Sequence, residues 1–146
     1  MDRPFLQWID GYAVGHEDLD REHRRLVDVI NEIHAAELAG NTGEAGRFLG
    51  ILRDVTAEHL GHESAIMHEV ESRAAQATGG RQAFLAAMSA AVIDEHIGDH
   101  ARSLRQIETI IRGFHAGERV SDALRGWFVE HAVRYDAHLK AVFQAM

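Results

Sequence analysis

The sequence contains no cysteine, which excludes disulfides, thiolate metal sites, iron–sulfur clusters and catalysis by a thiol. Proline is almost absent as well, since Pro4 is the only one among 146 residues. Because proline breaks helices, every segment after Pro4 is free to be helical. Alanine, leucine, arginine, glutamate and isoleucine dominate these segments, and such a composition favours α-helices.

Long hydrophobic runs and excess basic charge are also lacking. No stretch approaches the ~20 consecutive apolar residues that cross a membrane. The 15 basic and 23 acidic residues give a net charge of −8, which argues against nucleic-acid binding because phosphates attract clustered Lys and Arg. The first residues lack the layout of a signal peptide, so we expect a cytoplasmic protein. The length and the 46% hydrophobic content predict a single globular domain over residues 1–146.

Apolar residues recur every three or four positions in four segments that glycine-bearing breaks separate. We expect helices over residues 18–39, 44–77, 81–112 and 122–144, and an irregular arm over residues 1–17. Short connections between long helices favour antiparallel neighbours. The sequence therefore predicts an all-α fold, an up-down-up-down antiparallel four-helix bundle.

Histidine is the residue in excess, with eleven in the chain, and it interrupts the apolar stripe of every expected helix. Two pairs on these stripes are spaced four residues apart, so each pair shares one helix face. Burying such groups without partners is costly, whereas a metal site in the bundle core satisfies them together. The histidines and the carboxylate on the inward stripes are His23, His59, Glu63, His96, His100 and His131.

Spacing alone does not decide whether a carboxylate of the fourth helix faces the site. Asp136 follows His131 by five residues, so the two diverge by about 140° on a regular α-helix. Two metals side by side or a π-like turn would accommodate both residues. Tyr135 lies closer to the stripe than Asp136 does.

The register of the second helix has an alternative too. Glu58 and His62 are four residues apart, like His59 and Glu63, but their stripe is less apolar. We therefore prefer His59 and Glu63 as metal ligands. We expect His62 to be solvated, or to contact one of the metal ligands without binding the metal itself. The other histidines expected to be exposed or to cap helices are His16, His34, His115 and His138.

Five histidines and two carboxylates are too many ligands for one tetrahedral zinc, and suit two octahedral ions that share bridging carboxylates. Imidazole-rich coordination with oxygen and without thiolate fits iron, with manganese or zinc as alternatives. The ferritin-like di-iron proteins use repeated Glu-x-x-His pairs, which these stripes lack.

Four blocks of the sequence resemble the motifs of bacterial hemerythrins, and the resemblance spans most of the chain. The blocks are, in order, WIDGYAVGHEDLDREHRRLVDVINEIH, HLGHESAIM, HIGDH and WFVEHAVRYD. This resemblance favours His59 over His62 and Asp136 over Tyr135. It implies a non-haem site of two Fe ions joined by an oxo or hydroxo group.

The resemblance also implies a role for each site residue. The ligands of one iron are His96, His100 and His131. The ligands of the other iron, which keeps a position open for dioxygen, are His23 and His59. The bridging carboxylates are Glu63 and Asp136. The residues that line a dry pocket for dioxygen are Leu26, Leu60, Trp127, Phe128 and Ala132, of which Leu60 and Ala132 are smaller than is usual in the family.

From this resemblance we expect a protein that binds dioxygen reversibly as a carrier, store or sensor, and that is not an enzyme. The roomier pocket keeps one alternative open, a di-iron peroxidase, oxidase or nitric-oxide-handling repair protein. Another alternative is an iron store or detoxification module.

The segment between the HLGHESAIM and HIGDH blocks is longer than the family pattern by about five helical turns. It predicts a helical hairpin over residues 70–92 that projects past the metal end of the bundle. Phe84 and Met88 near its tip lack cover in a monomer, and an exposed apolar patch typically marks an interface. We expect self-association or protein docking there, unless the arm, with Phe5 and Trp8, covers the hairpin.

Overall fold

The computed structural model describes residues 3–75, 80–135 and 139–140, and for 70–71, 73–75, 80–93, 96–97 and 134–135 it describes the backbone only. Within these ranges the chain is helical and contains no strand. The elements are η1 (Asp10–Tyr12), α1 (Glu17–Leu38), α2 (Thr42–Ala75), α3 (Gly80–His115), α4 (Ser121–Val129) and the π-helix η2 (Glu130–Tyr135). No helix in the described part is long and apolar enough to cross a membrane.

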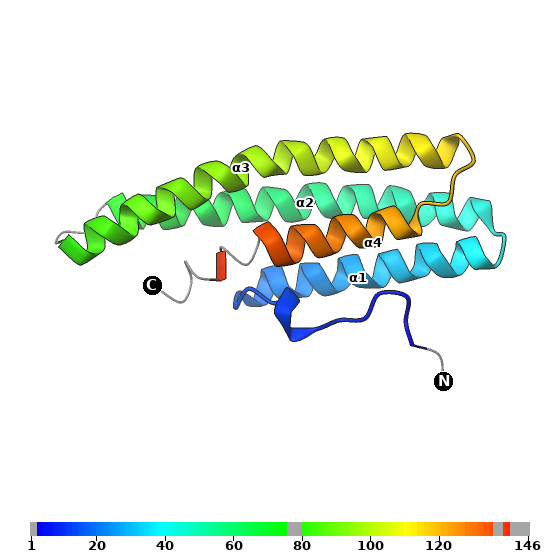
Figure 1. The fold of residues 1–146 in the computed structure, drawn as a ribbon, viewed down its shortest axis with the longest axis horizontal. Helices are drawn as coiled ribbons and strands as arrows, with labels where there is room; N and C mark the ends of the chain where they lie inside the picture. Colours follow the sequence, from blue (N-terminus) through cyan, green and yellow to red (C-terminus); the bar gives the residue numbers. More distant parts are fainter. Residues whose placement is uncertain (1–2, 76–79, 136–138, 141–146) are drawn as a thin grey trace.

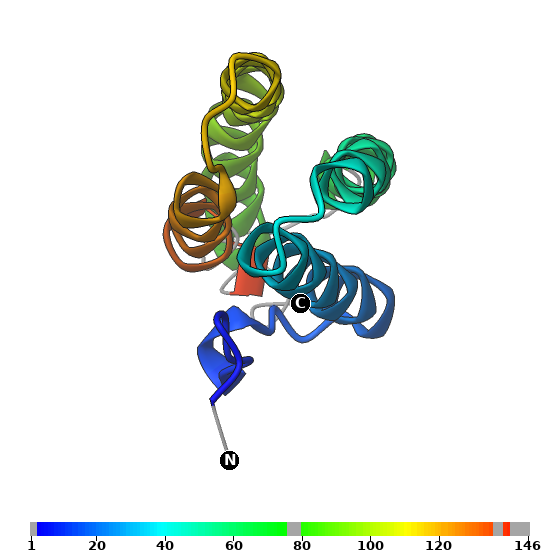
Figure 2. The same cartoon turned by 90° about the vertical axis from the view of Figure 1, so that its right-hand side faces the viewer.

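The four α-helices form the predicted antiparallel bundle, in which each helix runs opposite to the one before it (Figure 1). Seen along the bundle, α1 contacts α2 and α4, and α3 contacts the same two helices (Figure 2). The up-down-up-down topology expected from the sequence is therefore confirmed.

Local interactions explain where α1 begins and ends. The Nδ1 atom of His16 accepts a hydrogen bond from the backbone N–H of Leu19 at 3.4 Å, so His16 caps the helix as expected. Asp20 accepts hydrogen bonds from the backbone of Val14 and Gly15, which folds the arm back onto the first turn. At the other end Gly40 has a φ of 68°, a left-handed conformation that ends helices.

The helices α2 and α3 are longer than α1, with 34 and 36 residues against 22. At 1.5 Å per residue they reach about 50 Å, and they extend beyond the start of α1 as the expected hairpin (Figure 1). The side chains of residues 80–93 lie outside the described residues, so the apolar patch at Phe84, Leu85, Met88 and Val92 stays a prediction. The helix α3 continues through Gly113 to His115, three residues further than expected, because the chain reverses only at Gly117, where φ is 91°.

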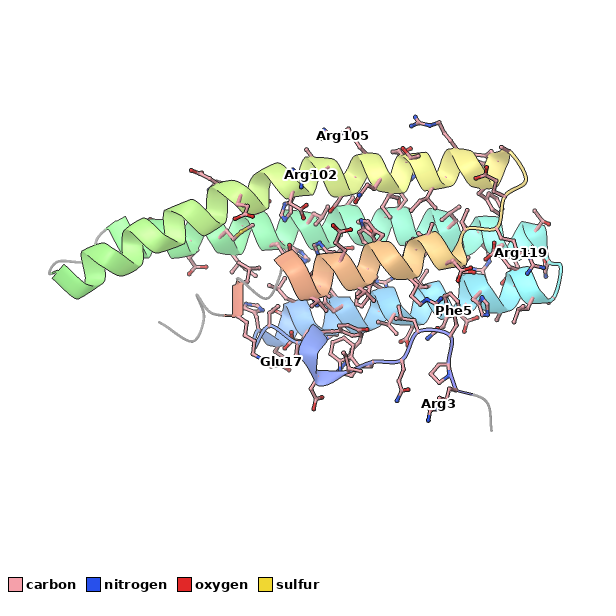
Figure 3. All side chains as sticks on the ribbon, in the orientation of Figure 1. Arg3, Phe5, Glu17, Arg102, Arg105 and Arg119 are labelled. Carbon is pink, nitrogen blue, oxygen red and sulfur yellow. The ribbon has the colours of Figure 1, made fainter. Side chains whose placement is uncertain are left out.

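The amino-terminal arm packs along the bundle and does not cover the hairpin, so the alternative expectation was wrong. The side chain of Asn31 holds the backbone of Leu6 through two hydrogen bonds, of 2.7 and 2.9 Å. Phe5, which Figure 3 labels, lies on this arm. It stacks on His34 with ring centroids 3.8 Å apart, and the guanidinium of Arg125 lies over its ring. The arm therefore closes the side of the bundle between α1 and α4.

Among the described residues, the buried apolar ones form two clusters. The larger one includes Leu26, Ile30 and Phe128, and the smaller one includes Leu19 and Met67. Histidines and a glutamate lie between the clusters in sequence, since α1 has His23 between Leu19 and Leu26. A polar layer is therefore enclosed by apolar packing on both sides.

Candidate metal centre

Three histidines and one glutamate converge in this polar layer. His23 comes from α1, His59 and Glu63 from α2, and His131 from η2, and at most 1% of each is exposed. One donor atom of each side chain lies within 4.8 Å of the others. His59 Nε2 is 2.7 Å from Glu63 Oε1, 3.1 Å from His23 Nε2 and 3.3 Å from His131 Nε2. Four of the predicted ligands therefore surround one point of the core.

The two oxygens of Glu63 face different histidines. Oε1 is 2.7, 3.6 and 3.8 Å from the Nε2 atoms of His59, His131 and His23, respectively. Oε2 accepts a hydrogen bond of 3.0 Å from Nε2 of His100, which comes from α3. This arrangement is the one expected of a carboxylate that bridges two neighbouring metal ions.

The chemistry of the donors fits a metal. Imidazole nitrogen and carboxylate oxygen without thiolate are suited to several transition metals, among them iron, manganese and zinc. The ligand atoms of the four buried side chains lie within 4.8 Å of one another, and metal binding would satisfy them together. The cluster therefore constitutes a candidate metal-binding site.

Two predicted ligands are not fully described. Asp136 lies outside the described residues, and so does the side chain of His96, whose backbone belongs to α3. The backbone before Asp136 nevertheless forms the π turn that the spacing suggested, since η2 spans Glu130–Tyr135. A π turn contains more residues than an α turn, so positions five apart come closer to one face. The fourth helix therefore departs from the regular α-helix expected over residues 122–144.

Glu22 is a part of the site that sequence reasoning missed. Its Oε1 accepts a hydrogen bond of 2.9 Å from His59 Nδ1, and its other oxygen accepts one from His62 Nδ1. Such a contact fixes the ring orientation and directs Nε2 toward the other possible ligands of the cluster. A carboxylate next to His23 was visible in the sequence, but its partner depends on how α1 and α2 are rotated.

Two further contacts orient histidine rings. The backbone carbonyl of Tyr12 in η1 accepts a hydrogen bond of 2.8 Å from His23 Nδ1. The hydroxyl of Ser64 lies 3.0 Å from His100 Nδ1. Every residue has a backbone carbonyl, so the sequence does not indicate which one contacts His23. The contact follows from the path of the arm in the structure.

The helix α2 turns His59 and Glu63 toward the core, which is the register that the sequence pattern favoured over Glu58 and His62. His59 and Glu63 are fully buried, whereas Glu58 is exposed and 52% of the His62 side chain is accessible. Among the described residues, His62 contacts the centre through Glu22, as expected for a solvated residue outside the ligand set.

The electrostatics keep both carboxylates ionised. Burial would raise the pKa of Glu63, but the neighbouring imidazoles of His59 and His131 and a hydrogen bond from His100 hold it well below its usual range. Partial burial would likewise raise the pKa of Glu22, and hydrogen bonds from His59 and His62 lower it. The same contact raises the pKa of His62. Negative charge at these positions favours cation binding.

The five predicted pocket residues are all buried. Two of them touch the histidines: the indole of Trp127 stacks on His131 with centroids 5.6 Å apart, and Phe128 meets His23 edge-on at 5.9 Å. The exposed fractions do not exceed 6% for Leu26, Leu60, Trp127, Phe128 and Ala132. Apolar packing around the histidines keeps water away from this part of the centre.

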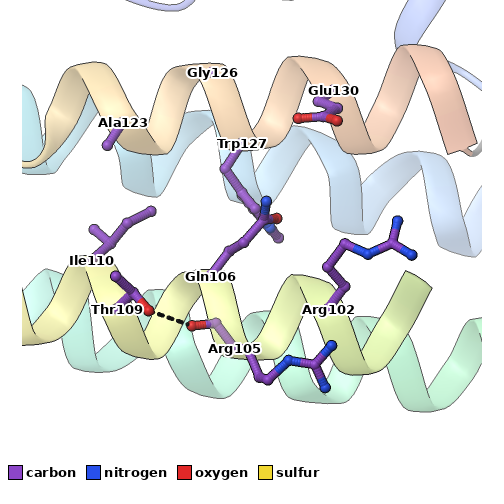
Figure 4. Close-up of a pocket in the computed structure, with 9 residues that line it drawn as sticks. All are labelled: Arg102, Arg105, Gln106, Thr109, Ile110, Ala123, Gly126, Trp127 and Glu130. Atoms are coloured by element: carbon purple, nitrogen blue, oxygen red, sulfur yellow. Dashed lines mark hydrogen bonds between the residues drawn. The ribbon is translucent and has the colours of Figure 1, made fainter. Parts of the chain in front are cut away.

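Trp127 also lines a surface groove between α3 and α4, of about 520 Å³ (Figure 4). Arg102, Arg105 and Gln106 of α3 flank the groove, and Glu130 lies at its α4 side. The indole therefore separates this groove from the ring of His131.

Comparison with known proteins agrees with the resemblance seen in the sequence. The model of the hemerythrin HHE cation binding domain matches residues 14–143. A bacteriohemerythrin of Stenotrophomonas maltophilia (strain R551-3) is 25% identical over 130 residues, which cover 86% of this chain and 73% of that protein. A bacteriohemerythrin of Pseudomonas aeruginosa (strain LESB58) is 25% identical over 146 residues, which cover 97% and 84%, respectively.

Proposed function

This chain belongs to the hemerythrin family, and from that premise we propose that it holds two iron ions and binds dioxygen reversibly. The observation that carries the proposal is the position of Glu63, whose two oxygens contact different histidines, His59 from α2 and His100 from α3. A single buried carboxylate in contact with His59 and with His100 is suited to join two ions.

We assign the ligands as the family resemblance implies. One ion would be held by His23 and His59 and the other by His96, His100 and His131, while Glu63 and Asp136 would be shared by the two ions. In the structure, His131 Nε2 lies only 3.3 Å from Nε2 of His59, although this assignment gives the two histidines to different ions.

When bound, two ferrous ions would supply the electrons with which dioxygen is held and would recover them on release. The chain itself orients the ligands and excludes water. Glu22 and the carbonyl of Tyr12 fix the rings of His59 and His23. Leu26 and Phe128 are fully buried and belong to the apolar cluster that adjoins the histidines. Exclusion of water favours release of dioxygen over its reduction.

Iron content in two matched variants tests the site. His59 and His62 lie three residues apart on α2, one fully buried and one with 52% of its side chain exposed. Elemental analysis after iron-replete expression should find two iron ions in the wild type and in His62→Ala, and fewer in His59→Ala. One ion or none in the wild type would contradict the proposal. Loss of iron from His62→Ala alone would show that the other register of α2 holds the metal.

A further inference from the structure

A buried hydroxyl lies on the helix that supplies His59 and Glu63. The side chain of Thr56 is fully buried, and its Oγ1 has no hydrogen-bond partner among the described residues. A threonine inside a helix commonly donates to the carbonyl four residues earlier, and this bond is absent here. A buried polar group without a partner is destabilising, so its presence calls for an explanation.

Thr56 occupies the layer next to the metal centre. It precedes His59 by three residues and Glu63 by seven, so all three lie on one face of α2. Leu26 follows His23 by three residues, and Phe128 precedes His131 by three, so both belong to the same layer. Leu26 and Phe128 are fully buried members of the larger apolar cluster. Thr56 therefore brings a hydroxyl into the apolar packing that we assign to the dioxygen pocket.

We propose that the Thr56 hydroxyl donates a hydrogen bond to the small ligand held at the metal centre. This inference rests on the proposed function, because it requires a ligand beside His59. In a dry site a hydrogen bond is stronger than in water, and a donor left without its acceptor penalises ligands that cannot accept one. Thr56 is thus a residue that selects for hydrogen-bond acceptors such as dioxygen and the azide anion.

Ser103 provides a matched control. It is also a buried hydroxyl, 2% exposed, and it follows His100 by three residues on α3. Unlike Thr56, its hydroxyl has a partner inside the protein, because it donates to Asp99 Oδ2 at 3.5 Å. Removing the hydroxyl of Ser103 should therefore affect the fold and leave ligand binding unchanged.

The test combines two measurements on Thr56→Val, Thr56→Ser and Ser103→Ala. The first is the melting temperature of the metal-free protein, and the second is the azide dissociation constant of the iron-loaded, oxidised protein, measured by absorbance titration. Thr56→Val replaces an unpaired hydroxyl by a methyl of the same shape, so the metal-free protein should melt at a higher temperature. Its azide dissociation constant should rise by about ten- to a hundredfold, the range for a hydrogen bond to a charged group.

The two remaining variants distinguish the effect of losing the hydroxyl from the effect of changing the side-chain packing. Thr56→Ser keeps the donor and should bind azide within about threefold of the wild type. Ser103→Ala should melt at a lower temperature and bind azide as the wild type does. Equal azide affinity in Thr56→Val and the wild type would overturn the inference, and so would a lower melting temperature of metal-free Thr56→Val. If Thr56→Ser loses azide as Thr56→Val does, the hydroxyl is not the group that matters.

Failure of the inference is distinguishable from failure of the proposed function. A wild-type protein that binds dioxygen reversibly while Thr56→Val binds azide normally would refute the hydrogen bond alone. A wild-type protein that takes up no iron, or whose iron binds neither azide nor dioxygen, would overturn both.

Discussion

Removal of the metal should lower the melting temperature of this protein by a measurable amount. His59 Nε2 lies 3.1 Å from His23 Nε2 and 3.3 Å from His131 Nε2, and none of these side chains is more than 1% exposed. Such buried imidazoles gain metal–ligand bonds in the folded state that an unfolded chain cannot arrange. Metal binding therefore adds to the free energy of unfolding through linkage.

The size of the effect follows from occupancy. A ligand present at a hundred times its dissociation constant stabilises the folded state by about 2.7 kcal/mol for each site. For a domain of this length, 1 kcal/mol shifts the melting temperature by roughly 2–4 °C. Each filled site should therefore raise the melting temperature by about 5–11 °C, and two sites by about twice as much.

The assay is thermal unfolding followed by circular dichroism, with and without ferrous iron under anaerobic conditions. His62→Ala should keep the iron-dependent shift, and His59→Ala should lose most of it. Equal melting temperatures with and without iron would refute the reasoning, since the cluster would then not be a buried metal site. An undiminished shift in His59→Ala would refute the role of that histidine.

Three further predictions concern the surroundings of the centre. Glu22→Gln removes the charge that orients His59, so iron affinity should fall by about 10–100-fold in competition with a chelator, and an unchanged affinity would contradict this role. Asn31→Ala breaks both hydrogen bonds to the backbone of Leu6, so the free energy of unfolding in urea should fall by about 1–3 kcal/mol, whereas no change would show that the arm is held by packing alone. Deleting residues 72–88 and closing the gap with a short glycine turn should leave iron content intact and abolish self-association in sedimentation, and a monomer both before and after deletion would refute self-association through the hairpin.

The bundle could be predicted from the sequence because helical periodicity determines which residues face inward. Glycine-bearing breaks in the apolar pattern predicted the turns between the helices. The predicted end of the third helix at residue 112, just before Gly113, was wrong, because α3 continues to His115. A single glycine is tolerated inside a helix that tertiary packing supports, and the reversal needs the left-handed conformation of Gly117. The π turn of η2 was only one of the possibilities that the spacing of His131 and Asp136 allowed.

The inward-facing part of the site was predictable for the same reason. His23, His59 and Glu63 lie on stripes whose period is that of the helix, so their convergence follows from the bundle. The contacts behind the rings were not predictable, because they depend on helix rotation and on the path of the arm. Glu22 meets His59 across two helices, and the carbonyl that holds His23 belongs to η1.

The most direct test of the central claim is the absorption spectrum of the reduced, iron-loaded protein through repeated cycles of oxygen and vacuum. We predict a visible charge-transfer band that appears under oxygen, disappears under vacuum and returns over several cycles with constant iron content. A band that never forms, or one that bleaches irreversibly with net consumption of oxygen, would contradict reversible binding. The second of these results would instead favour a di-iron oxidase or peroxidase.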